Sequence, residues 1–299
     1  MTKPDKSVTP YLALIAVQFF FGTLPVIGKM VLKVVPSVGL VGFRVGITAI
    51  VLIAVQLARK NFWLSNKNDY WRLAVLSLFG VTFNQLLFTT GLSLTKATNA
   101  SVLLITIPIF ALIAGVIAGT ERLRRLKIAG MLLAAGGVVL ILDPSKASFT
   151  AETTLGDLFI ILNSLSFGIF LATSKYVITR NGAIRSMMWV FVFAAAVCVP
   201  IGIFSMSGVD VQAIQPTVWL LVVYVAIVAT AIPYLLNAWA QARVNPSTVA
   251  VFIYMQPIIG FLLAVIFLDE HIDLKFITAA VLIFSGVFLV TRKFVPIET

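Results

Sequence analysis

PIFALIAGVIAGTERLRRLKIAGMLLAAGG, residues 108–137, returns as PIIGFLLAVIFLDEHIDLKFITAAVLIFSG, residues 257–286, after an interval of 149 positions. In each copy a long apolar run has its proline near the middle and ends on a carboxylate, and a second apolar run closes on glycine. The matched positions are Pro108 with Pro257, Glu121 with Glu270, Leu123 with Ile272, Ile128 with Ile277 and Gly137 with Gly286. Solenoid repeats have periods of roughly 20–50 residues, so this longer interval indicates a duplicated half-protein.

The composition is typical of a chain embedded in a lipid bilayer. Of 299 residues, 60% are hydrophobic and 11% are charged, and the mean hydropathy is +1.07, whereas soluble domains carry about 25% charged residues. Apolar runs of about 20 residues match the thickness of a bilayer core. The net charge of +11 lies mostly in the short links between runs, so we interpret it as a topology signal and expect no nucleic-acid partner.

The sequence has little to offer for thiol, imidazole or metal chemistry. Cys198 is the single cysteine and His271 the single histidine, so neither an intramolecular disulfide nor a zinc cluster is expected. We predict no catalytic residue, no metal site and no cofactor. The first apolar run is long enough to span a bilayer, which favours a mature helix over a signal peptide.

Ten apolar runs predict ten transmembrane helices. They cover roughly residues 11–32, 37–58, 71–94, 98–119, 126–142, 155–178, 184–205, 217–242, 247–268 and 274–292. The longest link, residues 143–154, falls at the expected boundary between the repeats. We therefore expect an all-α membrane protein with one five-helix repeat over 11–142 and a second over 155–292.

Basic residues alternate between the two sides of the predicted bundle. Fifteen of the 22 lysines and arginines fall on the side of both termini, and four fall on the other: Lys33, Lys96, Lys146 and Lys275. By the positive-inside rule both termini are cytoplasmic. Each half contains an odd number of helices, so the two halves must be inserted in opposite orientations, as in secondary transporters with inverted repeats.

The chain resembles the drug/metabolite transporter superfamily, specifically proteins with two EamA-type domains. The features that carry this resemblance are PheGlyThrLeuProValIleGlyLys at 21–29, GlyPheArg at 42–44, and the two blocks at 108–137 and 257–286. It implies a carrier of ten helices with a central cavity, often an exporter of amino acids or other small metabolites. Sugar-phosphate carriers of the same superfamily similarly use cationic residues to bind their substrates.

Three cationic residues lie within apolar runs: Lys29, Arg44 and Lys175. A charge inside the bilayer costs at least about 2.5 kcal/mol on insertion scales, which marks such residues as candidates for substrate binding. The alternative is that these long side chains reach to the headgroups or pack structurally. Arg44 lies deeper than either lysine and has glycines two residues away on both sides, which favours a cavity role.

Polar and aromatic residues at helical spacing form a second group of candidates. Helix three carries Asn84, Gln85 and Phe88; helix eight carries Tyr234 and Asn237 in one stripe with Gln241. Helix six contributes Asn163 and Phe167, and helix nine contributes Tyr254 and Gln256. A cavity lined by amides and rings would bind an amino-acid-like solute. Hydrogen bonding between helices explains the same residues one by one.

Four prolines inside the apolar runs are candidate hinges: Pro25, Pro108, Pro233 and Pro257. Each lacks an amide hydrogen and frees a carbonyl one turn earlier, so each either bends during gating or holds a static kink. Glu121 and Glu270 lie at run ends, where a structural role with a neighbouring basic side chain or backbone amides is favoured.

These observations together predict a secondary transporter for a small-molecule substrate in the cell (inner) membrane, working by alternating access. The cationic cavity favours an anionic or zwitterionic metabolite. Export of drug-like or cationic compounds is the alternative within this class. A membrane-embedded lipid-modifying enzyme and a channel are the rivals from other classes. The sequence leaves the choice between monomer and homo-oligomer open.

Overall fold

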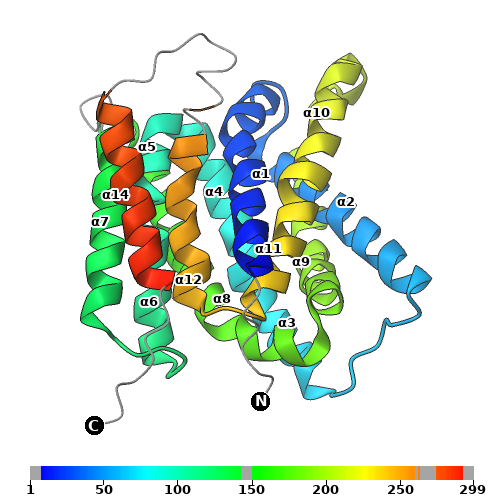
Figure 1. Ribbon diagram of the computed structural model, residues 1–299. Coiled ribbons are helices and arrows are strands. Elements are labelled where there is room, and N and C mark those ends of the chain that lie inside the picture. The colour runs from blue at the N-terminus through cyan, green and yellow to red at the C-terminus, as the bar shows by residue number, and fades with distance from the viewer. Residues whose placement is uncertain (1–7, 143–149, 260–261, 263–273, 292–299) are drawn as a thin grey trace.

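The computed structural model describes residues 8–142, 150–259, 262 and 274–291, which form helices and short links without any strand (Figure 1). The uninterrupted helices are α1 (Thr9–Val31), α2 (Ser37–Ala58), α7 (Arg125–Leu142), α8 (Thr154–Asn181), α9 (Ala183–Ser205) and α14 (Leu274–Thr291). Among the described residues nine helices are long and apolar enough to cross a membrane. A further apolar helix, Pro246–Ile259, is shorter over its described part.

Four spans are interrupted, and the interruptions recur at equivalent positions of the two repeats. The third span is α3 (Asn68–Ser77), the π-helical turn η1 (Leu78–Thr82) and α4 (Phe83–Leu94). The eighth is α10 (Pro216–Ala226), the π turn η4 (Ile227–Ala231) and α11 (Ile232–Gln241), with a short 3-10 helix, η3 (Val211–Ala213), before it. The two π turns lie 149 residues apart, which is the interval of the sequence repeat.

The fourth and ninth spans break just before their prolines. The fourth consists of α5 (Ala97–Leu103) and α6 (Thr106–Ile117), and the ninth of α12 (Pro246–Val251), the 3-10 turn η5 (Phe252–Met255) and helical residues 256–259. Pro108 and Pro257 donate no backbone hydrogen bond, which weakens the turn before them. The predicted all-α membrane fold is confirmed, and the described helix ends lie within about three residues of the predicted ones.

The two repeats interlock instead of lying side by side. Helix α8, the first of the second repeat, packs along α4 and α6 of the first repeat, and α1 packs along α11 of the second. Two pairs of equivalent helices pack extensively against each other, α2 with α9 and α7 with α14. Figure 1 shows α7 and α14 side by side and running in opposite directions. This arrangement is that of an inverted repeat.

Glycines bring α7 and α14 into backbone contact. A Cβ atom placed on Gly286 would lie 2.4 Å from the carbonyl oxygen of Gly130, and one on Gly137 would lie 2.7 Å from that of Ala279. The neighbouring Gly136 has no such atom within 4 Å. Between helices in lipid, close van der Waals contact replaces the hydrophobic effect as the source of stability, and small residues permit it.

The first described helix starts and the last one ends at the same end of the bundle (Figure 1). This agrees with an even number of crossings, while the side of the membrane that this end faces stays a prediction. Glu121 accepts a hydrogen bond from the backbone nitrogen of Ser247 at 2.6 Å and pairs with Lys127 at 2.5 Å. It thus supplies an acceptor to the first turn of α12. Glu270 and Lys146 lie outside the described residues.

We expect Gly137→Ala to destabilise the protein relative to Gly136→Ala. Both changes bring the same gain in helix propensity, but only the first forces a methyl group against the α14 backbone, at a cost of about 1–3 kcal/mol. Thermal melting in detergent measures the difference. Equal melting temperatures for the two variants would contradict the close α7–α14 contact.

Reporter fusions test the orientation. In a bacterial host, green fluorescent protein fused to either terminus should fluoresce, because the basic links hold both termini inside. Alkaline phosphatase should be inactive at both termini and active when it is inserted in the link at residue 146. Active phosphatase at one terminus only would contradict an even number of crossings.

Candidate functional site

A cavity lies between the interlocked repeats. The cavity has a volume of about 80 Å³. This is several times the roughly 10–15 Å³ that one water molecule needs. Its wall comes from the first, third, fourth, sixth, eighth and ninth spans and from one residue of α2. Nine of the twelve predicted binding residues line it: Arg44, Asn84, Gln85, Phe88, Asn163, Phe167, Tyr234, Asn237 and Gln256.

Arg44 is the residue that α2 contributes, and it is 2% exposed. Its Nε donates to Thr230 Oγ1 at 3.1 Å and its Nη1 to Thr89 Oγ1 at 3.3 Å, whereas Nη2 donates to no described residue. The ion pairs among the described residues lie elsewhere: Arg72 and Arg180 with Asp69, and Lys127 with Glu121. Two neutral hydroxyls therefore orient the guanidinium and leave donors for an anion.

Two buried amides in the wall lack hydrogen-bond partners among the described residues. Gln85 of α4 is 1% exposed and neither its Oε1 nor its Nε2 is paired, and Asn237 of α11 has an unpaired Oδ1. A buried polar group without a partner is uncommon because its lost hydration is not replaced. The wall thus holds unpaired donors and acceptors in addition to the charge of Arg44.

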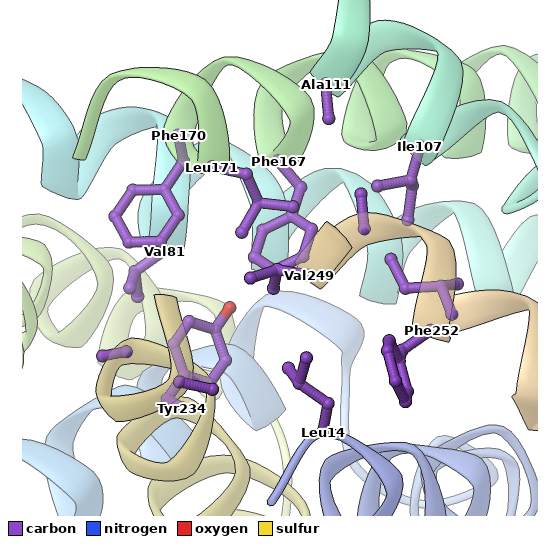
Figure 2. Packing of buried hydrophobic residues seen from close by; sticks show 14 of the residues in the cluster. Leu14, Val81, Ile107, Ala111, Phe167, Phe170, Leu171, Tyr234, Val249 and Phe252 are labelled. Atoms are coloured by element: carbon purple, nitrogen blue, oxygen red, sulfur yellow. The ribbon is translucent and has the colours of Figure 1, made fainter. Parts of the chain in front are cut away.

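Other polar residues hold the wall together. The hydroxyl of Tyr234 lies 2.9 Å from the carbonyl oxygen of Gly80 and 3.0 Å from Asn84 Oδ1, and Asn163 Nδ2 donates to the Asn84 carbonyl at 2.8 Å. Figure 2 shows this hydroxyl turned toward the side where Phe167 of α8 lies. Gly80 belongs to the π turn η1, where helical pairing is irregular. Hydrogen bonding between helices, the sequence-based alternative, therefore coexists with lining the cavity.

Lys29 and Lys175 lie outside the cavity wall. Lys29 Nζ donates to the carbonyl of Thr95 at 2.8 Å, and Lys175 Nζ donates to that of Val244 at 2.7 Å. Both acceptors follow the end of a helix, α4 or α11, where carbonyls lack helical partners. Thr95 and Val244 are 149 positions apart, so the two repeats make the same hydrogen bond from a lysine to a helix-end carbonyl, which we call a lysine tie. Because α1 and α8 run in opposite directions, the ties lie at opposite ends of the bundle.

Tyr254 also lies outside the wall, because its hydroxyl donates to the Ile105 carbonyl at 3.0 Å in the break between α5 and α6. Among the candidate hinges, Pro108 and Pro257 follow the breaks of the fourth and ninth spans, and Pro233 is the second residue of α11, directly after the π turn η4. The helix α1 continues through position 25, that of Pro25.

Sequence analysis missed Gln18 and Phe21 of α1. Gln18 is 2% exposed and its Oε1 accepts from Gln256 Nε2 at 2.9 Å, while the Phe21 ring meets Tyr234 edge to face at 5.9 Å. Phe21 was visible as the repeat equivalent of Phe167, which was selected. Gln18 lies one turn before it on the same helical face. The rest of the wall is aliphatic: Leu24, Leu104, Ile107, Leu171, Val249 and Ile253.

Comparison with known proteins agrees with this architecture. The profile of the EamA-like transporter family matches residues 8–143 and 154–292. An uncharacterized transporter of Archaeoglobus fulgidus is 25% identical over 89% of this chain and 91% of its own length. A WAT1-related protein of Arabidopsis thaliana is 26% identical over 93% of this chain and 87% of its own. A crystal structure at 20% identity shares the fold with a TM-score of 0.75, covering 94% of this chain and 96% of the other.

Two matched repeats, an all-helical bundle and a central cavity together lead to one assignment. The chain belongs to the EamA-like transporter family and is a multi-pass membrane transporter of small solutes.

Proposed function

We propose that the protein is a secondary transporter for small metabolites that carry a carboxylate or phosphate, with amino acids and related zwitterions as the favoured class and export as the direction. The buried, unpaired charge of Arg44 is the observation that carries this proposal. An isolated buried charge is unfavourable, and a bound anion would supply the missing counter-charge through paired N–H donors. The neighbouring amides and rings suit an amino-acid-like solute.

The rival functions fit the cavity less well. A cationic drug would meet Arg44 without a compensating carboxylate in the described wall. A lipid-modifying enzyme usually needs clustered acids, histidines or a metal, and the described residues contain no group of three or more metal-ligating side chains. A channel needs a charged ring or a carbonyl filter along a pore, whereas the described wall of this cavity has a single charged side chain, Arg44.

We infer alternating access from the two lysine ties. The symmetric units are the repeats over 11–142 and 155–292, and the first helix of each repeat packs against helices of the other. Lys29 ties α1 to the end of α4 at one end of the bundle, and Lys175 ties α8 to the end of α11 at the other. Breaking one tie would let that end of the cavity open while the other stays closed.

We further propose uniport or exchange in the cell (inner) membrane, without a cofactor. Proton relays in transporters commonly use buried carboxylates or histidines, and the described wall of the cavity contains neither. A strong dependence of transport on an imposed pH gradient in proteoliposomes would count against this mode.

Arg44→Gln should weaken binding of a transported anion or zwitterion at least tenfold, about 1.4 kcal/mol, because the bound anion loses its counter-charge. Binding is measured by thermal shift and counterflow against amino acids, nucleosides and phosphorylated metabolites. The melting temperature of the unliganded variant should not fall, because an uncompensated buried charge is removed. Arg59→Gln, at the exposed end of the same helix, is the matched control. Unchanged affinity in Arg44→Gln would remove the anion site.

Lys29→Met and Lys175→Met should shift access to the cavity in opposite directions. Each removes one charge-assisted hydrogen bond worth about 1.5 kcal/mol, enough for roughly a tenfold change in population. In a Cys198→Ser background carrying Leu24→Cys, an impermeant maleimide added outside should react faster in Lys29→Met and more slowly in Lys175→Met. Lys33→Met, in the exposed link after α1, is the control. Equal changes in both variants would contradict opposite gates.

A further inference from the structure

Two amides of the cavity wall are not needed by an anion site alone. Gln85 and Asn237 are 1% and 6% exposed, and the oxygen of each lacks a hydrogen-bond partner among the described residues. Other amides of the wall have partners: Gln256 donates to Gln18, and Asn163 donates to the backbone of the third span. A buried acceptor without a partner is unfavourable unless a ligand supplies a donor.

The repeat places these amides on opposing helices. Gln85 is the equivalent of Tyr234, and Phe88 is the equivalent of Asn237, each pair 149 positions apart. At these two pairs of positions each helix presents one amide and one ring to the cavity, in exchanged order. A solute bound between α4 and α11 therefore meets an amide oxygen from each side.

Arg44 is fixed close to the same two helices. Its Nη1 donates to Thr89, which lies one helical turn after Gln85 on α4, and its Nε donates to Thr230, which lies in the π turn preceding α11. Residues four apart share a helix face, so Gln85 lies about one turn from the point where the guanidinium is held. A carboxylate and an amino group on one carbon fit this separation.

We propose that Gln85 and Asn237 recognise the amino group of a zwitterionic solute whose carboxylate pairs with Arg44. Their side-chain oxygens accept from the ammonium, and Gln85 Nε2 donates to the carboxylate. This inference rests on the proposed function and narrows its substrate class to solutes with both groups. An analogue without the amino group leaves both buried oxygens unpaired, and sites built for hydrogen bonding reject such analogues strongly.

Matched pairs of solutes test the proposal on the purified, full-length protein. Binding is measured for leucine against 4-methylpentanoate, phenylalanine against 3-phenylpropanoate, and serine against 3-hydroxypropanoate. The wild type should bind the amino acid of at least one pair tenfold or more tightly than its deaminated partner. Gln85→Met with Asn237→Leu, which roughly keeps side-chain volume, should reduce the amino acid to the level of the partner and change the partner's affinity less than twofold.

Two further variants separate recognition from folding. Asn237→Asp keeps an acceptor at the same place and should keep the preference for the amino acid. Gln241→Met changes the next amide of the same stripe, which is buried against α8 outside the cavity and bonds to Leu171 and Ser174, and should leave the preference intact. If Gln241→Met abolishes the preference as well, the effect is structural and the proposal is overturned.

The outcomes distinguish this proposal from the function on which it rests. Equal affinity of the wild type for both members of every pair, with sensitivity to Arg44→Gln, would overturn amino-group recognition and leave the anion transporter standing. Binding of phosphorylated metabolites only would do the same. If no carboxylate or phosphate binds in an Arg44-dependent way, both proposals fall.

Discussion

The constraint on which this structure depends is that backbone polar groups inside a bilayer must find partners within the protein. Water is absent there, so irregular backbone survives only where it is buried against other protein groups or lines a cavity. The third, fourth, eighth and ninth spans are all interrupted near the middle of the molecule. Side chains from other spans complete the pairing: Tyr234 lies against the carbonyl of Gly80, and Tyr254 donates to that of Ile105. The interruptions of the fourth and ninth spans contribute Leu104 and Ile253 to the cavity wall, and the two π turns directly precede α4 and α11, which also line it.

Duplication explains how one set of contacts serves both ends of the molecule. Each repeat lends its first helix to the other, and each of these helices carries a lysine that ties down the end of a neighbouring span. Because the repeats are inverted, identical local chemistry appears at opposite ends. A symmetric frame of this kind has two related ways to open, which is what the proposed alternating access around a fixed site requires.

The proposed solute-binding residues lie where the repeats differ. At the constant offset of the first two helices, Arg44 corresponds to Val190, so only one repeat contributes a charge to the cavity. The equivalents of Gln85 and Phe88 are Tyr234 and Asn237, which exchanges amide and ring between the helices. The symmetric contacts thus form the frame, and the differences between the repeats make the wall of the cavity asymmetric, as the proposed binding of a zwitterion requires.

Hydropathy and the 149-residue interval sufficed to predict the paired halves, nine of the ten spans and the helix ends that the structure describes, because span length follows from bilayer thickness. Nine cavity residues were also found: seven are polar and stand out because polar groups are costly in lipid, and Phe88 and Phe167 lie one helical turn from a selected asparagine. Three contacts were beyond reach from sequence: Lys29 and Lys175 bind helix-end carbonyls, and Tyr254 bonds to a helix break. Helical periodicity reports which face of a helix a residue occupies, not which distant carbonyl its side chain reaches. Only tertiary packing decided that the first helix of each repeat packs against the other repeat. A helix face is equally apolar whether it contacts lipid or protein, so the sequence does not tell the two surroundings apart.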